Sequence, residues 1–149
     1  MNTSLSDLYQ EVILDHSRHP RNFGPAEQAN LSARGNNPLC GDRVTVHLKV
    51  EDDVIEDALF EARGCAISLA SASMMTEMIK GKSEAEARDL FERFQALVTG
   101  EPGADEAGLD GLTALAGVKD FPTRIKCATL AWHAMSAALD GTDDNVKTE

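Results

Sequence analysis

Three cysteines and one aspartate are the residues of this 149-residue chain best suited to chemistry. Cys40 and Asp42 flank a single glycine, Cys65 follows Cys40 by 25 residues, and Cys127 follows Cys65 by 62 residues. Three thiolates and a carboxylate can bind zinc in a tetrahedral arrangement. Thiolates also hold iron–sulfur clusters, so the ligand types alone leave both kinds of metal centre open.

The surroundings of the cysteines favour this chemistry over structural packing. An odd number of cysteines argues against a disulfide framework, although free cysteines can also pack as small inert hydrophobes. Cys65 and Cys127 are each predicted at or near a helix N-terminus, where unpaired backbone N–H groups stabilise a thiolate. Cys40 and Asp42 lie in a turn shaped by Pro38 and Gly41, just before a predicted strand.

Hydrophobic periodicity predicts the elements that position these residues. Period-two alternation predicts strands over 43–50 and 54–62, with a further strand near 31–34. Helical spacing predicts helices that begin after Ser4, at 66 and behind a capping box at Ser83, and a last helix that begins at Pro122. Strands followed by helices indicate an α+β domain, in which a small antiparallel sheet of about three strands packs against several helices.

The chain is expected to form one domain over residues 1–140. Residues 100–120 contain five glycines and several acids, so they are interpreted as a loop-like insertion before the last helix, with a short helix over 112–116. Residues 141–149 are polar and are expected to fray.

Composition excludes some classes of function. The net charge of −11 argues against nucleic-acid binding, which requires clustered basic residues. No apolar run is long enough to cross a bilayer. The polar N-terminus does not resemble a signal peptide, so a cytoplasmic location is expected.

The histidines are weaker candidates for metal ligands. His47 is predicted on the outward face of its strand, and His133 is turned away from the face of Cys127. His16 and His19 close the first predicted helix, where they either cap its carbonyls or meet a partner.

Four motifs in order make the chain resemble the U-type iron–sulfur assembly proteins, the IscU, SufU and N-terminal NifU group. The resemblance extends from Leu8 to about Leu139. Its motifs are His19-Pro20-Arg21-Asn22-Phe23-Gly24, Asn37-Pro38-Leu39-Cys40-Gly41-Asp42, Gly64-Cys65-Ala66-Ile67-Ser68-Leu69-Ala70-Ser71-Ala72-Ser73-Met74-Met75 and Lys126-Cys127-Ala128.

Two details resemble the SufU branch. Lys126 stands where IscU-like members have a histidine, and the 100–120 insertion matches SufU-like members. The resemblance implies zinc, or alternatively an iron–sulfur cluster, and it implies a SufS-type pyridoxal-phosphate cysteine desulfurase and downstream iron–sulfur assembly proteins as partners. The implied zinc ligands are Cys40, Asp42, Cys65 and Cys127.

A mechanistic hypothesis follows for sulfur transfer. Cys40 is taken as the acceptor, because its turn is more movable than the two helix-anchored cysteines, and it attacks the persulfide of the desulfurase as a thiolate. Arg124 and Lys126 then stabilise the negative sulfur. The chain would thus be a zinc-dependent sulfurtransferase. The alternatives are a scaffold on which an iron–sulfur cluster is assembled, and a structural-zinc domain used only for binding.

Overall fold

The computed structural model describes residues 5–25, 27–38, 41–101, 109–141 and 145–147. Three antiparallel strands form most of its sheet: β1 (Leu31–Asn37), β2 (Asp42–Glu51) and β3 (Val54–Arg63). A short fourth strand, β4 (Asn145–Lys147), lies parallel to β1, so the strand order is β3-β2-β1-β4. The predicted α+β class with a small antiparallel sheet is confirmed.

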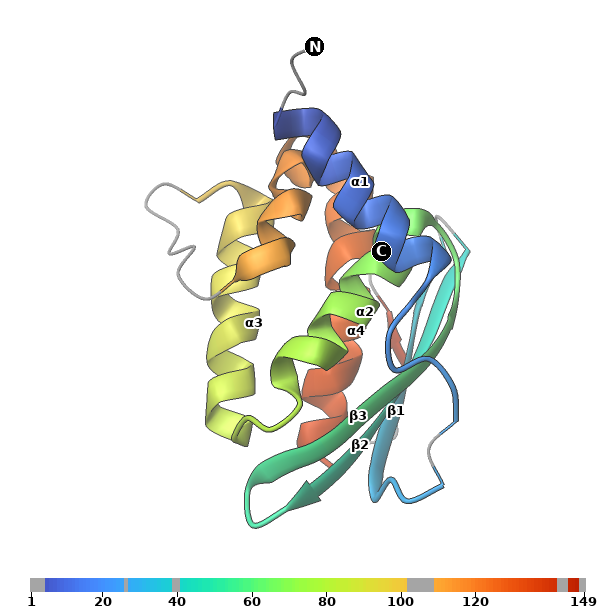
Figure 1. Cartoon of the computed structure of the whole chain (residues 1–149). Coiled ribbons are helices and arrows are strands. Elements are labelled where there is room, and N and C mark those ends of the chain that lie inside the picture. The colour runs from blue at the N-terminus through green and yellow to red at the C-terminus, as the bar shows by residue number, and fades with distance from the viewer. Residues whose placement is uncertain (1–4, 26, 39–40, 102–108, 142–144, 148–149) are drawn as a thin grey trace.

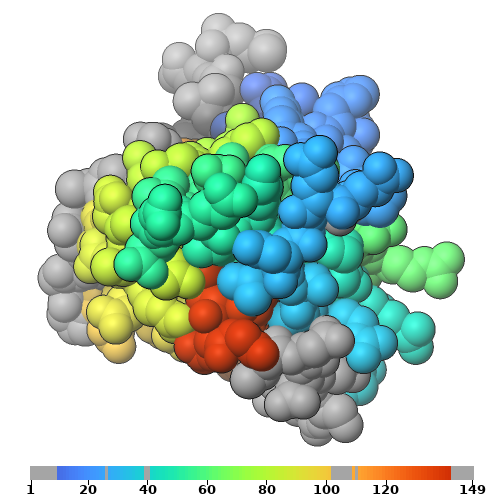
Figure 2. All heavy atoms as spheres, turned by 90° about the horizontal axis from the view of Figure 1, so that it is seen from below, coloured from blue at the N-terminus to red at the C-terminus, as the bar shows by residue number. Residues whose placement is uncertain are grey.

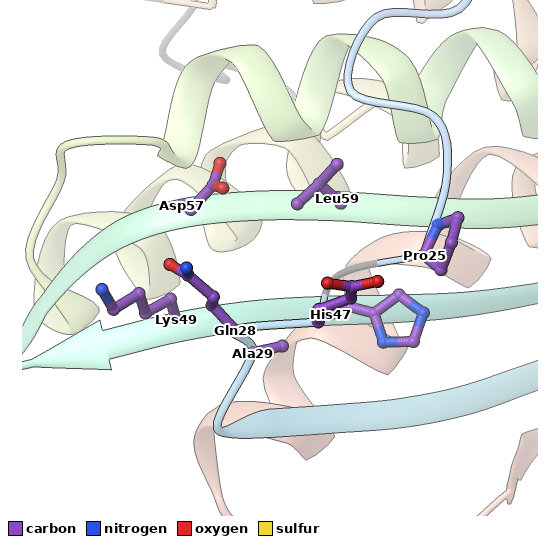
Figure 3. Close-up of a pocket in the computed structure, with 8 residues that line it drawn as sticks. Pro25, Gln28, Ala29, His47, Lys49, Asp57 and Leu59 are labelled. Atoms are coloured by element: carbon purple, nitrogen blue, oxygen red, sulfur yellow. The ribbon is translucent and has the colours of Figure 1, made fainter.

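Strand β2 lies between β3 and β1, and the alternation of buried and exposed side chains along it gives the sheet two different faces. Val44, Val46 and Leu48 are buried on the inner face, while Arg43 is exposed on the outer face. The outer face contains a hollow lined by His47, Lys49 and neighbouring residues of β3 and the loop before β1 (Figure 3). The sequence therefore predicted correctly which side of β2 faces the core.

The helices all lie on the inner side of the sheet, and α2 and α4 pack directly on it (Figure 1). Helix α2 (Ala66–Ile79) contacts β3, and α4 (Pro122–Leu139) contacts β1 and β2. Helix α1 (Leu5–Arg18) covers α2, while α3 (Glu84–Thr99) packs on α4. No helix of the described part of the chain is long and apolar enough to cross a membrane.

Local signals set the ends of the helices. Ser83 and Glu86 form the expected capping box, and Gly100 ends α3 in the left-handed conformation with φ 76°. Pro122 is the first residue of α4, as predicted. Figure 2 shows the end of the molecule where the β2–β3 hairpin lies beside the start of α3, which is joined to it by a hydrogen bond from the Glu84 N–H to the Asp53 carbonyl.

Two expectations about the later part of the chain need correction. The short helix expected over 112–116 is present, but it is part of a longer 3₁₀ helix, η1, which extends over Asp110–Asp120 and buries Leu112, Leu115 and Val118 in the core, so this part of the insertion is not loop-like. The tail was expected to fray, yet Asn145–Lys147 pairs with β1 as strand β4. Apolar spacing was hard to recognise among the glycines of the insertion, and strand pairing with a distant partner leaves no local signal.

Candidate metal centre

Asp42 is a carboxylate buried at the end of the sheet far from the hairpin. It is the first residue of β2 and is completely inaccessible to solvent, because the alternation that buries Val44 and Val46 also turns Asp42 inward. Among the residues that the structure describes, no lysine, arginine or histidine forms an ion pair with it. A buried carboxylate is costly unless it is paired or coordinates a metal, so this position itself indicates a cation site.

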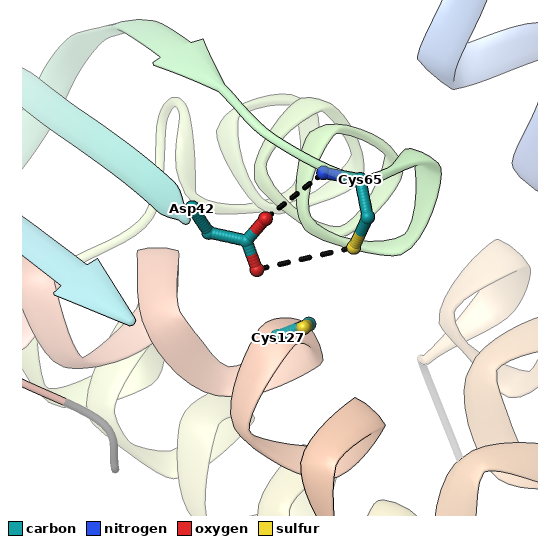
Figure 4. Close-up of side chains that lie close together, drawn as sticks. All are labelled: Asp42, Cys65 and Cys127. Carbon is teal, nitrogen blue, oxygen red and sulfur yellow. Dashed lines mark hydrogen bonds between the residues drawn. The ribbon is translucent and has the colours of Figure 1, made fainter. Parts of the chain in front are cut away.

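Cys65 meets Asp42 from the start of α2. It is the N-cap residue, with extended backbone angles, and it is half-buried. Its backbone N–H donates a hydrogen bond to Asp42 Oδ1 over 2.9 Å, and its Sγ lies 3.9 Å from Asp42 Oδ2. The predicted location of Cys65 at a helix N-terminus is therefore confirmed, and its side chain and backbone both face the carboxylate (Figure 4).

Gly64 allows this close approach, and sequence reasoning assigned it no role. Its φ is +152°, and a Cβ atom built on it would lie only 2.2 Å from Asp42 Oδ1. Any side chain at this position would therefore displace the carboxylate as well as strain the backbone. The signal in the sequence was the glycine immediately before Cys65.

Cys127 completes a group of three ligand atoms. Its side chain is fully buried, and the three ligand atoms of Asp42, Cys65 and Cys127 all lie within 4.8 Å of one another. Cys127 is the sixth residue of α4, beyond the four N–H groups that a helix N-terminus leaves unpaired. The prediction that a helix N-terminus activates Cys127 was therefore wrong. The structure nevertheless brings Cys127 to the centre, as part of the second turn of α4.

Asn37 supplies the hydrogen bond that the helix terminus cannot. This residue at the end of β1 is fully buried, and its Nδ2 donates to Cys127 Sγ over 3.7 Å. Donation to sulfur favours the thiolate form. The sequence analysis included Asn37 in a motif without giving it a function, because a contact between residues 90 positions apart has no local signal.

The other residues predicted for the site have different outcomes. Cys40 lies outside the described residues, two positions before Asp42 in the sequence. Arg124 is exposed and Lys126 half-buried, three residues and one residue before Cys127 on α4. Their influence on a sulfur at the centre stays a prediction.

The side chains of three histidines have partners outside this centre. His47, on the outer sheet face as predicted, contacts Glu61 at 3.1 Å, and His16, in the last turn of α1, has its Nδ1 2.7 Å from Ser73 Oγ of α2. The ring of His133 packs edge-on against Phe91 at a centroid distance of 4.9 Å. Burial lowers the pKa of both His16 and His133.

The donor set fits a zinc ion. Zinc bonds of about 2.3 Å to sulfur and 2.0–2.2 Å to oxygen imply a sulfur–oxygen separation of about 3.6 Å in a tetrahedral site. The separation between Cys65 Sγ and Asp42 Oδ2 is 3.9 Å. This pair of ligand atoms thus already lies close to the spacing that a shared metal requires, and Cys127 Sγ lies within 4.8 Å of both residues. The three ligands come from a strand, a helix cap and a helix.

Comparison with known proteins gives one consistent result. Residues 8–128 match the family model described as the NifU-like N-terminal domain. The chain is 46% identical over 138 residues to the zinc-dependent sulfurtransferase SufU of Bacillus subtilis, covering 93% of both chains. It is 41% identical over 152 residues to the iron–sulfur cluster assembly scaffold protein IscU of Streptococcus pyogenes, covering 97% of this chain and 95% of that one.

Solved structures share the whole fold. A putative iron–sulfur cluster assembly scaffold protein for the SUF system from Fervidobacterium islandicum superposes with a TM-score of 0.83 and 35% sequence identity. The match covers 91% of this chain and 99% of the other. A nitrogen-fixing NifU-like protein from Brucella abortus, N-terminal part, gives a TM-score of 0.82 at 25% identity, covering 91% of this chain and 94% of that one.

Proposed function

The chain belongs to the NifU-like N-terminal domain family, and on that premise we propose that it serves iron–sulfur cluster biogenesis as a zinc-dependent acceptor and carrier of persulfide sulfur. The sulfur donor is a pyridoxal-phosphate cysteine desulfurase of the SufS type. One observation carries the proposal: a fully buried carboxylate, Asp42, that has two cysteine thiols beside it and no ion pair to a described cation.

Four residues would hold the zinc ion. Asp42, Cys65 and Cys127 supply the three ligand atoms that already converge. Cys40 is the fourth, because two peptide units limit its Cα to within about 7 Å of that of Asp42. When bound, zinc would keep the cysteine ligands deprotonated at neutral pH.

The sulfur step proposed for Cys40 is an exchange without net oxidation. The Cys40 thiolate attacks the outer sulfur of the persulfide on the desulfurase, and a new S–S bond forms on Cys40. The S–S bond of the donor breaks, and its cysteine leaves as a thiolate. One sulfur atom thus moves from donor to acceptor, and the persulfide on Cys40 is its carried form.

Groups around the ligands have two further roles, to hold the ligands in place and to stabilise negative charge. The Cys65 N–H and the Asn37 amide hold the Asp42 carboxylate and the Cys127 sulfur in place, so these ligands stay fixed while Cys40 reacts. Arg124 and Lys126 on α4 would stabilise negative charge on the transferred sulfur.

A single-turnover transfer tests the proposal. Purified chain is mixed with persulfidated desulfurase without added reductant, and the cysteine that gains one sulfur atom is located by mass spectrometry, with zinc measured per chain in the same sample. The expected result is one zinc per chain and sulfur on Cys40, with transfer lost in Cys40→Ser. Full transfer to the Cys40→Ser variant would refute Cys40 as acceptor.

A cluster scaffold is the second candidate, favoured by the 41% identity to the IscU scaffold protein over almost the whole chain. Against it, Lys126 occupies the position of the histidine that IscU-like members have. Protein purified without oxygen from cells given both metals separates the two candidates. Iron and acid-labile sulfide in near-equal amounts, with little zinc, would establish the scaffold. A third outcome would indicate a structural-zinc domain: the Cys40→Ser variant loses zinc and becomes less stable, but sulfur transfer is unchanged.

A further inference from the structure

Two arginines face each other on the outer side of the sheet at the end that holds the metal centre. Arg43 of β2 and Arg63 of β3 are register partners in the antiparallel ladder, and both side chains are exposed. Like charges directly opposite each other on one sheet face are destabilising. A third exposed arginine, Arg34 of β1, is the register partner of Thr45, two positions along β2 from Arg43.

These three charges are not compensated within the described part of the chain. Arg34, Arg43 and Arg63 form no ion pair there, although the chain has 25 acidic residues for 14 basic ones. Glu61 is the one acid lining the two shallow hollows around Arg43, and its carboxylate contacts His47 at 3.1 Å. The sheet therefore presents a local excess of positive charge on an acidic protein.

An exposed aromatic side chain borders the same arginines. Phe23 is 49% exposed, and it lines one hollow together with Arg43 and Arg63. Its ring packs edge-on against that of Phe60 at a centroid distance of 5.2 Å. Because Phe60 is buried on the inner face, Phe23 lies at the free edge of β3 and not among the arginines. Arginine and aromatic residues are enriched at protein–protein interfaces and among their energetic hot spots.

The chain connects this surface directly to the metal ligands. Arg43 follows Asp42, and Arg63 precedes Cys65 by two residues. Alternation along β2 places Asp42 and Arg43 on opposite sides of the sheet. After Arg63, Gly64 with its positive φ turns the chain, so that Cys65 faces Asp42 on the inner side. A partner bound to the arginines would therefore lie at the end of the sheet that carries Asp42 and the start of α2.

We propose that Arg34, Arg43 and Arg63, named here the arginine face, dock an acidic surface of the sulfur-donating desulfurase. This inference rests on the proposed function, which requires such a donor. Carboxylates of the partner would offset the repulsion between Arg43 and Arg63. This repulsion therefore destabilises the free chain but not the complex. A protein partner is favoured over nucleic acid by the overall charge of −11.

Calorimetric titration of the desulfurase from the same organism with the zinc-loaded chain tests the inference. The test variant is Arg43→Glu/Arg63→Glu. The control is the single variant Lys49→Glu, because Lys49 points to the same face of β2 at its other end. Zinc content and melting temperature are measured for each variant, which shows that the fold and the centre are intact.

The expected result is an affinity at least about tenfold lower for the double variant and within about twofold of the wild type for Lys49→Glu. The wild-type affinity should fall as salt increases, and that dependence should be weaker in the double variant. Equal affinities for double variant and wild type, or a wild-type chain that does not bind the desulfurase, would overturn the inference. Charge-dependent binding without sulfur transfer would uphold the docking surface and reject the proposed function.

Discussion

The two ends of the sheet differ in whether their charged side chains form ion pairs. At the hairpin end, Lys49 Nζ lies 3.5 Å from Glu56, and Lys80 Nζ lies 3.1 Å from Asp57, so each of these two lysines meets a carboxylate. At the other end, Arg43 faces Arg63, and the carboxylate of Asp42 is buried without an ion pair to a described cation.

This difference separates a region organised for stability from one organised for binding. The hairpin end holds two lysine–carboxylate ion pairs within the chain, and the backbone carbonyl of Asp53 in the turn accepts a hydrogen bond from the start of α3. The end with the metal centre keeps a buried charge and an exposed repulsion, both of which a ligand from outside the chain would relieve. Natural proteins accept such local costs mainly at functional sites.

Gly64→Ala should have the largest effect, because it disturbs the end of the sheet where space is most limited. The new Cβ would meet Asp42 Oδ1 and would also strain a backbone with φ +152°. We expect unfolding free energy to fall by about 3 kcal/mol, together with loss of zinc. Urea denaturation and metal analysis measure both.

Gly24→Ala is the matched control for this substitution. Gly24 also has positive φ, +141°, but a Cβ there would meet nothing within 4 Å. Its cost should be limited to backbone strain, about 1–2 kcal/mol, with zinc retained. Equal losses of stability in the two variants would show that the contact with Asp42 is unimportant.

The effect of Asp42→Asn on stability should have opposite signs in the metal-free and the zinc-bound protein. In metal-free protein the substitution removes a buried unpaired charge while an amide oxygen still accepts from the Cys65 N–H, so stability should rise by about 1–2 kcal/mol. With zinc present the variant should be the less stable protein, because it lacks a ligand. Thermal unfolding with a chelator and with excess zinc gives the two comparisons. A loss of stability in the metal-free variant would mean that Asp42 is adequately stabilised by the protein alone.

Arg63→Glu should stabilise the free protein slightly while weakening docking. It replaces a facing pair of like charges by an opposite pair, which is worth about 0.5 kcal/mol on a sheet surface. Arg63→Gln should give part of this gain, because it removes the repulsion only. Chemical denaturation of the three proteins at low salt measures the difference, and a destabilised Arg63→Glu would contradict the repulsion.

Lys49→Glu makes the opposite change at the hairpin end. It places an acid beside Glu56 and opposite Asp57, so we expect a loss of about 0.5 kcal/mol that decreases as salt is added. The same denaturation series measures it. A neutral result would show that the hairpin end does not depend on its charge pairing.

The pH dependence of stability should come from the helices and not from either end of the sheet. Burial lowers the pKa of His133 below its ordinary value of 6.5, so the unfolded chain binds more protons just below that pH. Stability should therefore fall as pH decreases from 7 towards 5.5, and His133→Phe should reduce the slope. Arg63→Glu, in contrast, should leave the slope unchanged over this range, and a large change there would contradict this assignment.

The sequence determined the local features on which this comparison depends. The alternation along β2 fixed which residues face the core, because a strand exposes its side chains to opposite faces in turn. The serine and glutamate of the capping box fixed the start of α3, and Pro122 fixed the start of α4, since each acts within a single helical turn. The spacing of the cysteines indicated a centre assembled from distant segments.

Only the tertiary structure decided how those segments meet. Asn37 reaches Cys127 across 90 positions, and the Cys127 sulfur joins the centre from the second turn of its helix, where no local rule places a reactive thiol. Strand β4 and the buried face of η1 likewise depend on partners that lie elsewhere in the chain. Local patterns report the conformation of a few neighbouring residues, whereas the contact between Asp42, Cys65 and Cys127 exists only because sheet and helices pack around one core.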